Sequence, residues 1–511
     1  MASNTHPIAP RKIERTGLAH FMTRVLKECS RAARRFDADA VHDLRVALRR
    51  SRTIADGLSN VDPDKSLRTL KTDSRELFRS LGALRDVQVM LEWVQKLDPN
   101  DDPLKPRIRE ILLQEQEAAK SDATAALGEF DIRRWRKWSK DLSEKSRRIP
   151  VGSLVFEHLA LERWIEAREM HRRAIRSRSR IGWHRVRIAL KRFRYTLENF
   201  LPRHYAEWSE ELKSVQDLLG AVHDLDVLRA KLRRITVRSG ANGGARSVTA
   251  PDAVSSHAMQ RWLDWIDAAR AGKLAEYRAK TFGKNSLWNL WRAGLPEGER
   301  LEAAALATLV SWASYRDPDI EHSRRVSKLA LELYDGFRNA QLNRAFREPR
   351  SRRILEAAAL LHDVGCAKQD SGHHKASYQM IRKLPPPLGW TSDDLLLTAL
   401  VARYHRGAEP NAEHEGYSSL MPEEREGVAW LAATIRLADG LDSDHNGRVS
   451  HVAVETSRPA LIVRAEGYLH DVESASALAK KKHLLETLCN TPVIVQPARE
   501  FAAAAVAGLA S

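Results

Sequence analysis

The sequence predicts a mainly α-helical protein: two related helical halves, then a second all-α domain that ends in a small αβ cap. Three observations predict this fold class. Helical periodicity runs, with short polar breaks, through about the first 450 residues, where no strand pattern is convincing. Two blocks of the N-terminal half recur in the same order further along the chain. At 511 residues the chain is too long for one compact core, so several domains are expected.

In the N-terminal half, the predicted helices cover residues 14–36, 41–59, 64–97, 105–128, 131–145, 154–178, 183–200, 205–235 and 255–279. The breaks between them are polar or rich in glycine and proline, as in DPNDDP and SGANGGARS.

An internal repeat organises these helices. VHDLRVALRRSRTI (41–54) aligns without gaps with WHRVRIALKRFRYT (183–196), at an offset of 142 residues. LGALRDVQVM (81–90) aligns with LGAVHDLDVL (219–228), at an offset of 138. Two blocks in the same order and at nearly the same separation predict a duplicated unit.

The first repeated block is basic along one face. From His42, the next cations follow at steps of 3, 7 and 10 residues, and His184 begins the same pattern. These steps keep the groups on one helical face, where like charges repel one another. Residues 172–195 hold ten Arg or Lys and no acid. A fold that aligns two such faces would be stabilised by binding a polyanion between them. Arg75 and Lys213, at matching positions before the second block, extend the basic surface.

These two repeated blocks resemble the CHAD domain (conserved histidine α-helical domain) over about residues 12–285, with halves at about 12–150 and 151–285. The resemblance implies two pseudo-symmetric four-helix bundles, a basic central groove and binding of inorganic polyphosphate. The groove would be lined by His42, Arg45, Arg49, Arg50, Arg52, His184, Arg187, Lys191, Arg192 and Arg194. The two histidines either contact the anion or are buried helix residues. Lys191 stands where the first half has Arg49, which keeps the charge but loses the bidentate fork.

Composition and charge limit the classes of partner that are expected. The net charge of +17 favours an anion: nucleic acid, polyphosphate or an acidic membrane. Nucleic acid is disfavoured because base recognition usually needs aromatic residues among the basic ones, and the face 42–52 has none. Three cysteines give no disulfide framework and the N-terminus lacks a signal-peptide core, so a cytoplasmic protein is expected. The apolar tail 501–510 is about half the ~20 residues of a membrane span; we expect a terminal helix or strand cover and no membrane insertion.

After a junction at 284–297, further helices are predicted at residues 299–315, 321–339, 352–362, 373–383, 391–404 and 422–439. Potential metal ligands stand at the ends of four of them: His322, then His362-Asp363, His405 and Asp439. Core packing does not explain histidine or aspartate at successive helix ends, whereas a divalent ion needs such ligands to converge from different elements.

The order of these ligands resembles the HD phosphohydrolase superfamily. The segments HSRRVSKLALELYDGF, AALLHDVG, SGHHKASYQMI, RYHRG and IRLADGLD resemble the C-terminal domain of the exopolyphosphatase/guanosine pentaphosphatase family, over about residues 298–497. The resemblance implies an HD-type domain at 298–449 and an αβ cap at 450–511, with three strands around the helix 471–489. It implies a first metal site of His322, His362, Asp363 and Asp439, and a second ion at His374 and His405, with His373 a weaker candidate. One or two ions such as Mn, Mg or Fe would be bound.

The implied chemistry is metal-assisted attack on phosphorus, with Asp363 both ligating the ion and orienting the nucleophile. Lys375, Arg403 and Arg406 are candidates for neutralising the phosphoryl charge. Many exopolyphosphatases have lost the HD ligands from this domain, but all four are present here. No phosphate-binding Gly-rich loop occurs in the chain, so hydrolysis would have to come from the HD site.

The sequence thus predicts a polyphosphate-binding, metal-dependent phosphohydrolase that cleaves phosphoanhydride bonds. Two alternatives remain open. One is a non-catalytic protein that targets polyphosphate granules, and the other is an HD hydrolase of (p)ppGpp-like or cyclic nucleotides.

Overall fold

The computed structural model describes residues 17–62, 64–97, 102, 104–241, 250–369, 371–457, 459–469 and 472–498. The chain divides into two compact units, residues 1–297 and 298–511. The fold is mainly α-helical with a small three-stranded sheet near the C-terminus, which confirms the predicted fold class. The finer domain limits at residues 12, 285 and 449 stay predictions, and the predicted cover at 501–510 lies outside the described residues.

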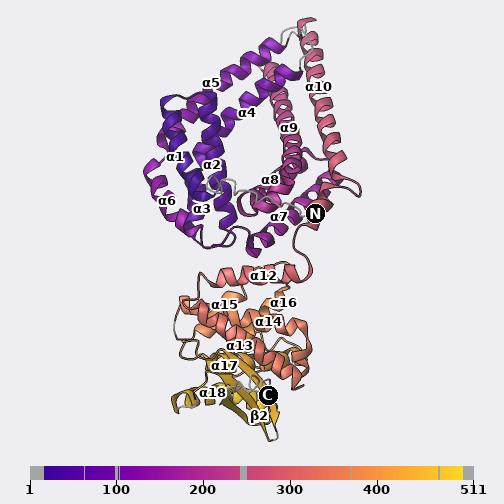
Figure 1. Ribbon diagram of the computed structural model, residues 1–511. Coiled ribbons are helices and arrows are strands. Elements are labelled where there is room, and N and C mark those ends of the chain that lie inside the picture. Colours follow the sequence, from indigo (N-terminus) through magenta and orange to yellow (C-terminus); the bar gives the residue numbers. More distant parts are fainter. Residues whose placement is uncertain are drawn as a thin grey trace, which may run out of the picture. The chain divides into compact units, whose positions relative to one another are not determined.

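The first half of the first unit contains six helices in its described part (Figure 1). They are α1 (Leu18–Arg34), α2 (Ala38–Leu58), α3 (Lys65–Asp73), α4 (Arg75–Leu97), α5 (Lys105–Glu129) and α6 (Ile132–Lys145). The helix predicted over 64–97 is interrupted at Ser74. There the Arg52 side chain donates to the carbonyl of Lys71 and to Ser74 Oγ. The guanidinium thus satisfies a carbonyl of the last turn of α3 that has no partner within the helix, and α3 ends at this point.

The second half repeats this order with one helix fewer. It contains α7 (Leu154–Ser177), α8 (Arg180–Phe200), α9 (Pro202–Ala241), α10 (Ala250–Thr281) and α11 (Leu287–Ala293). Helix α9 is continuous where α3 and α4 are separate, because buried Leu212 stands at the position that matches Ser74. The expected junction at 284–297 contains α11, whose Trp288 and Trp291 are fully buried. Tryptophan at a spacing of three residues places both rings on one face, and this packing makes the segment a helix.

The two halves contact each other through equivalent helices. Helix α2 packs against α8, and α4 packs against α9. One core joins Val87 and Met90 of α4 with Leu225 of α9 and Trp262 of α10. Both repeated blocks therefore lie at the contact between the halves.

The second unit is a helical bundle that ends in a small sheet (Figure 1). Its helices are α12 (Gly298–Ala313), α13 (Ile320–Asn339), α14 (Pro349–Leu361), α15 (His373–Ile381), α16 (Ser392–Arg403) and α17 (Pro422–Leu441). Strand β1 (His451–Ser457) pairs antiparallel with β2 (Ala460–Glu466), and β2 pairs parallel with β3 (Val493–Pro497). Helix α18 (Val472–Cys489) connects β2 to β3 and packs on α17. Among the described residues, none of the helices combines the length and apolarity that crossing a bilayer requires.

Candidate functional site

Four cations form the centre of the basic surface in the first unit; we call Arg45, Arg49, Arg187 and Lys191 the central cations. Two come from α2 and two from α8, at equivalent positions of the repeat. No carboxylate of the described chain lies within ion-pair distance of any of them. Among the residues that the structure describes, the buried Nε atoms of Arg45, Arg49 and Arg187 have no hydrogen-bond partner. Buried polar groups are normally paired, so this arrangement is suited to an added acceptor.

The electrostatics support the same interpretation. Burial, together with the charges of Arg187, Arg49 and Arg45, lowers the pKa of Lys191 to about 7. Asp86 and Asp224, the matching acids of the second repeated block, act on these cations. Burial raises the pKa of both carboxyl groups, although the nearby cations oppose that shift. The surface thus holds more positive charge than its two carboxylates can neutralise.

The other predicted groove residues have different surroundings. Most of the remaining arginines bind protein groups: Arg50 pairs with Glu198, Arg52 holds the α3–α4 break, Arg192 pairs with Glu166 at 2.8 Å, and Arg194 donates to Gln216 at 2.6 Å. His184 lies 3.1 Å from His223 between their Nδ1 atoms, so it contacts another imidazole. The side chains of His42, Arg75 and Lys213 are exposed. These contacts separate a structural set of arginines from the central cations.

In the second unit, five helices bring ligand-type side chains together. We call His322, His362, Asp363, His373, His405 and Asp439 the histidine–aspartate cluster. His322 is in the first turn of α13 and His373 begins α15, whereas His362 and His405 follow the ends of α14 and α16. Asp439 lies in the last turn of α17.

Three imidazoles are oriented in the same way. His362 Nδ1 lies 2.7 Å from the carbonyl of Ala359, and His405 Nδ1 lies 2.7 Å from that of Ala402. A carbonyl oxygen only accepts, so each Nδ1 carries a proton, and Nε2 is the nitrogen left to bind an ion once it is deprotonated. His322 Nδ1 lies 2.8 Å from Asp442 Oδ2, the carboxylate–histidine contact that commonly orients a metal ligand. The three Nε2 atoms are therefore arranged as ligands.

Asp363 is shared between two groups of histidines. Its Oδ2 lies 3.3 Å from His362 Nε2, whereas its Oδ1 lies 3.1 Å from His373 Nε2 and 3.6 Å from His405 Nε2. Burial alone would raise the pKa of Asp363, but these imidazoles hold it well below its usual range, so the group is a carboxylate. His322 Nε2 lies 3.4 Å from Asp439 Oδ1, and Lys481 of α18 holds Asp439 Oδ2. Burial would lower the pKa of His322, yet Asp439 and Asp442 raise it to about 9.

The structure places His373, rather than His374, beside Asp363 and His405. The rings of His373 and His405 are stacked with centroids 5.3 Å apart, whereas His374 and His405 are 6.4 Å apart. His374 lies at Gly407, and its buried Nδ1 has no partner. Burial first, and then His373, Arg406 and Lys375, lower the pKa of His374 to about 4. The predicted charge-neutralising cations thus lie close enough to His374, next to the cluster, to act on its pKa.

Close backbone contacts support the cluster. A Cβ on Gly365 would lie 2.2 Å from the carbonyl oxygen of His373, so only glycine fits between the two metal-ligand segments. Ser377 Oγ donates to the His362 carbonyl at 2.6 Å and accepts from Gly365 N at 2.9 Å. Buried Arg436 donates to three carbonyls on either side of His405, those of Tyr404, Gly407 and Ala408.

Sequence reasoning missed three residues of this site. Asp442 orients His322, and Lys481 binds Asp439 from a helix more than forty residues away. Cys366 has its sulfur within 4.8 Å of ligand atoms of both Asp363 and His373. Asp442 lies three residues after Asp439, one helical turn, which is the only sequence signal that could have identified it.

The donor set fits a divalent ion. Within the described part of the chain, the buried His322 Nε2, His362 Nε2 and Asp363 Oδ1 make no well-aligned hydrogen bond, although each lies 3.1–3.4 Å from a carboxylate oxygen or imidazole nitrogen of the cluster. Ligand atoms of His322, His362 and Asp363 all lie within 4.8 Å of one another, as do those of Asp363, Cys366 and His373. Neutral imidazole, carboxylate and thiol are ligands that suit zinc, iron and similar ions.

Comparison with known families agrees with this division of the chain. Residues 17–233 match the family model of the CHAD domain. Residues 306–484 match that of the Ppx/GppA phosphatase, domain III. The chain thus carries a CHAD domain followed by a Ppx/GppA phosphatase domain III, as its sequence motifs predicted. The two matches support a polyphosphate-related function and a phosphatase-like domain.

Proposed function

We propose that this protein is a metal-dependent polyphosphate phosphohydrolase. In this proposal the CHAD domain holds the polyphosphate chain on the central cations, and the histidine–aspartate cluster is an HD-type catalytic site. One observation carries the proposal: the buried Asp363 carboxylate directs one oxygen to His362 and the other to His373 and His405. A carboxylate between two sets of imidazole nitrogens is suited to a site for two ions.

The residues of the chain have separate roles in this site. His322, His362, Asp363 and Asp439 would hold the first ion, and Asp363, His373 and His405 the second. Asp442, Ala359 and Ala402 orient the imidazoles through their Nδ1 protons. Bound divalent ions would lower the pKa of coordinated water and polarise a phosphoryl oxygen.

Exposed Lys375 and Arg406, with the partly buried Arg403, are in position to bind the phosphoryl charge. All three act on the pKa of His374, so they lie on the side of the cluster where α15 begins and α16 ends. Their charges would stabilise an anion that reaches the cluster from this side. His374, whose pKa is lowered first by burial and further by His373 and these cations, is neutral and would donate or accept one hydrogen bond to that anion.

The decisive test is phosphate release from long-chain polyphosphate with added Mn²⁺ or Mg²⁺. We expect the wild type to release phosphate, and the His362→Ala/Asp363→Ala variant to lose release by at least a thousandfold while it still binds the chain. Metal content of both proteins is measured in parallel by mass spectrometry. Equal release by both proteins would exclude the cluster as the catalytic site.

One observation favours a second candidate, a non-catalytic polyphosphate-binding protein. Lys481 places an ammonium group on Asp439, where a divalent cation would otherwise neutralise that carboxylate. In this alternative the cluster is structural. Chain binding without release by the wild type, with or without Mn²⁺, Mg²⁺ or Fe²⁺, would support it.

A further inference from the structure

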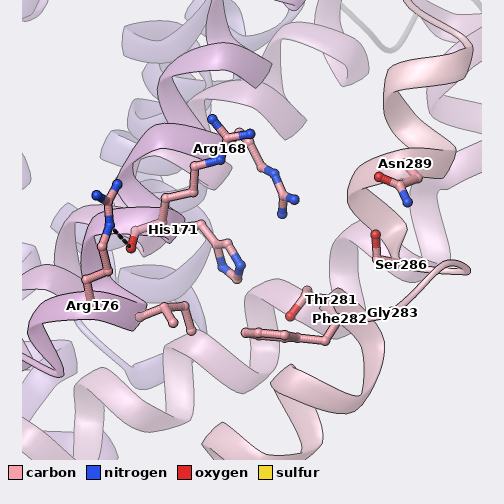
Figure 2. A pocket seen from close by; sticks show the side chains of 10 residues that line it. Arg168, His171, Arg176, Thr281, Phe282, Gly283, Ser286 and Asn289 are labelled. Atoms are coloured by element: carbon pink, nitrogen blue, oxygen red, sulfur yellow. Dashed lines mark hydrogen bonds between the residues drawn. The ribbon is translucent and has the colours of Figure 1, made fainter.

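A pocket of about 440 Å³ lies in the first unit, between α7 and the α10–α11 segment. Figure 2 shows Arg168 and His171 on one side of it, and Ser286 and Asn289 on the other. Arg172 and Arg176 also line it. Arg168, Arg172 and Arg176 follow one another at steps of four residues, so a single face of α7 supplies all three guanidinium groups.

The charge of this pocket is not balanced. The residues that line it include no aspartate or glutamate. Within the described part of the chain, none of its three arginines has a carboxylate at ion-pair distance. Burial first, and then the charge of Arg172, lower the pKa of Arg168. Like charges at this spacing repel, and in a partly desolvated site the repulsion is poorly screened.

The pocket also has rigid walls. The Arg168 guanidinium lies over the Trp288 ring, 5.3 Å from its centroid. His171 is buried, with its Nδ1 2.9 Å from the Tyr277 hydroxyl and its ring against Phe282 and Trp288. Burial, Arg168 and Arg172 lower the pKa of His171 to about 4, so the guanidinium groups alone carry the charge. Held in place in this way, Arg168 loses little side-chain entropy when it binds a ligand, whereas Arg172 and Arg176 are exposed at the pocket rim.

We propose that this pocket binds a small phosphate-bearing anion, at a site separate from the central cations. Guanidinium groups form bidentate, charge-assisted hydrogen bonds with phosphate oxygens. The hydroxyl of Ser286 and the amide of Asn289 supply neutral donors opposite them. The volume suits a ligand of nucleotide size or smaller. None of the four central cations lines the pocket, so this proposal does not depend on the proposed function.

The ligand has two possible sources with the same phosphate chemistry: a free inorganic anion or a nucleotide. Phe282 lines the pocket and is 48% exposed, which is unusual for a large apolar ring. A flat base could stack on this ring, as bases do on exposed aromatic side chains. Pyrophosphate and adenosine diphosphate are therefore the two probes that distinguish these sources.

The test is calorimetric titration of the full chain with each probe, in EDTA so that no metal ion mediates binding. We expect the Arg168→Ala/Arg172→Ala variant to bind pyrophosphate about tenfold to a hundredfold more weakly, from loss of charged hydrogen bonds. Arg173→Ala is the matched control, because Arg173 lies on the same helix but pairs with Glu169 at 2.7 Å. It should change the affinity less than twofold. The central cations can also bind pyrophosphate, so each pocket variant is compared with its parent in an Arg45→Ala/Lys191→Ala background, where that second site is removed.

The single Arg172→Glu variant tests whether the loss of binding in the double variant comes from misfolding, because Arg172 is exposed and its replacement should not disturb the fold. It should weaken pyrophosphate binding at an unchanged melting temperature. Tighter binding of adenosine diphosphate, reversed by Phe282→Ala, would identify a nucleotide, whereas equal binding would identify an inorganic anion. Pyrophosphate binding that survives both Arg172→Glu and the double variant would overturn the proposal.

Discussion

At the scale of the residue, Lys191 determines how the CHAD domain responds to pH. Its ammonium faces Arg187 on its own helix, Arg45 and Arg49 of α2, and the carboxylate of Asp224 on α9. Asp86 of α4 and the imidazoles of His184 and His223 are also near. In the folded, ligand-free protein its pKa is about 7, against 10.5 for an ordinary lysine. Between these values the unfolded chain binds more protons than the folded one.

The free energy of unfolding of the ligand-free protein should therefore rise as pH increases from about 7 towards 10, because folding no longer buries a charged Lys191. Below pH 7 the group is protonated in both states and its destabilising effect is complete. Lys191→Met should stabilise the protein at pH 6.5 and much less at pH 9, measured by urea unfolding. The control is Lys213→Met, an exposed lysine of the same half, which should change little at either pH. An equal effect of Lys191→Met at both pH values would contradict this account.

Cys366 is the residue that should bias the metal preference. Its sulfur lies near Asp363 and His373, and thiolate is a soft ligand that favours zinc or iron over magnesium. We expect Cys366→Ser to lower zinc affinity at least about tenfold and to leave magnesium affinity nearly unchanged. The cobalt-loaded wild type should show a sulfur-to-metal charge-transfer band that Cys366→Ser abolishes and Cys489→Ser keeps. A band of equal strength in all three proteins would exclude Cys366 as a ligand.

The sequence could predict much of the candidate site, but not all of it. Ligand residues at the ends of successive helices pointed to His322, His362, Asp363, His405 and Asp439, and the helix ends do bring them together. His373 and His374 are adjacent, so spacing alone could not decide which one faces Asp363. The start of α15 at His373, next to Gly365, decides it. Lys481 reaches Asp439 only because α18 packs on α17, a tertiary contact without a local signal.

At the scale of the element, most helices could be predicted from periodicity, and two departures have physical causes. The helix expected over 64–97 breaks because Arg52 reaches across to a carbonyl of its last turn. Helix α11 was missed because seven residues are too few for periodicity to be recognised. In both cases side chains from other helices, rather than local propensity, determine the outcome.

The contact between the turn after His362 and helix α15 gives a prediction for the second unit. Gly365→Ala would place a methyl group 2.2 Å from a backbone oxygen and 2.6 Å from the backbone nitrogen of Ser377. Neither segment can move without displacing a candidate metal ligand, His362, Asp363 or His373. We therefore expect the free energy of unfolding to fall by about 2–4 kcal/mol, and metal binding to be lost. Gly427→Ala is the matched control. A Cβ there meets nothing within 4 Å, and in a helix interior it should stabilise by about 0.5–1 kcal/mol. The melting temperature and the metal content of both variants are measured against the wild type. An unchanged melting temperature and metal content in Gly365→Ala would show that the close contact is not required.

At the scale of the whole molecule, the proposed function assigns the holding of polyphosphate to one unit and its cleavage to the other. The central cations belong to the first unit and the histidine–aspartate cluster to the second. A polyphosphate chain bound on the first unit would be presented to the second at a high effective concentration, provided that the polyphosphate is long enough to reach both. A short substrate gains nothing from the first unit.

Chain length should therefore reveal whether the two units cooperate. For long-chain polyphosphate, Arg45→Ala/Lys191→Ala should raise KM about tenfold or more and leave kcat nearly unchanged, because it removes binding that is equal in ground and transition states. For tripolyphosphate the same variant should behave like the wild type. Added salt should raise the wild-type KM for long chains and reduce the difference between the proteins, since screening weakens the same contacts. If the variant instead lost activity equally on both substrates, the central cations would act on the cluster itself rather than on the chain, and the division of roles between the units would be wrong.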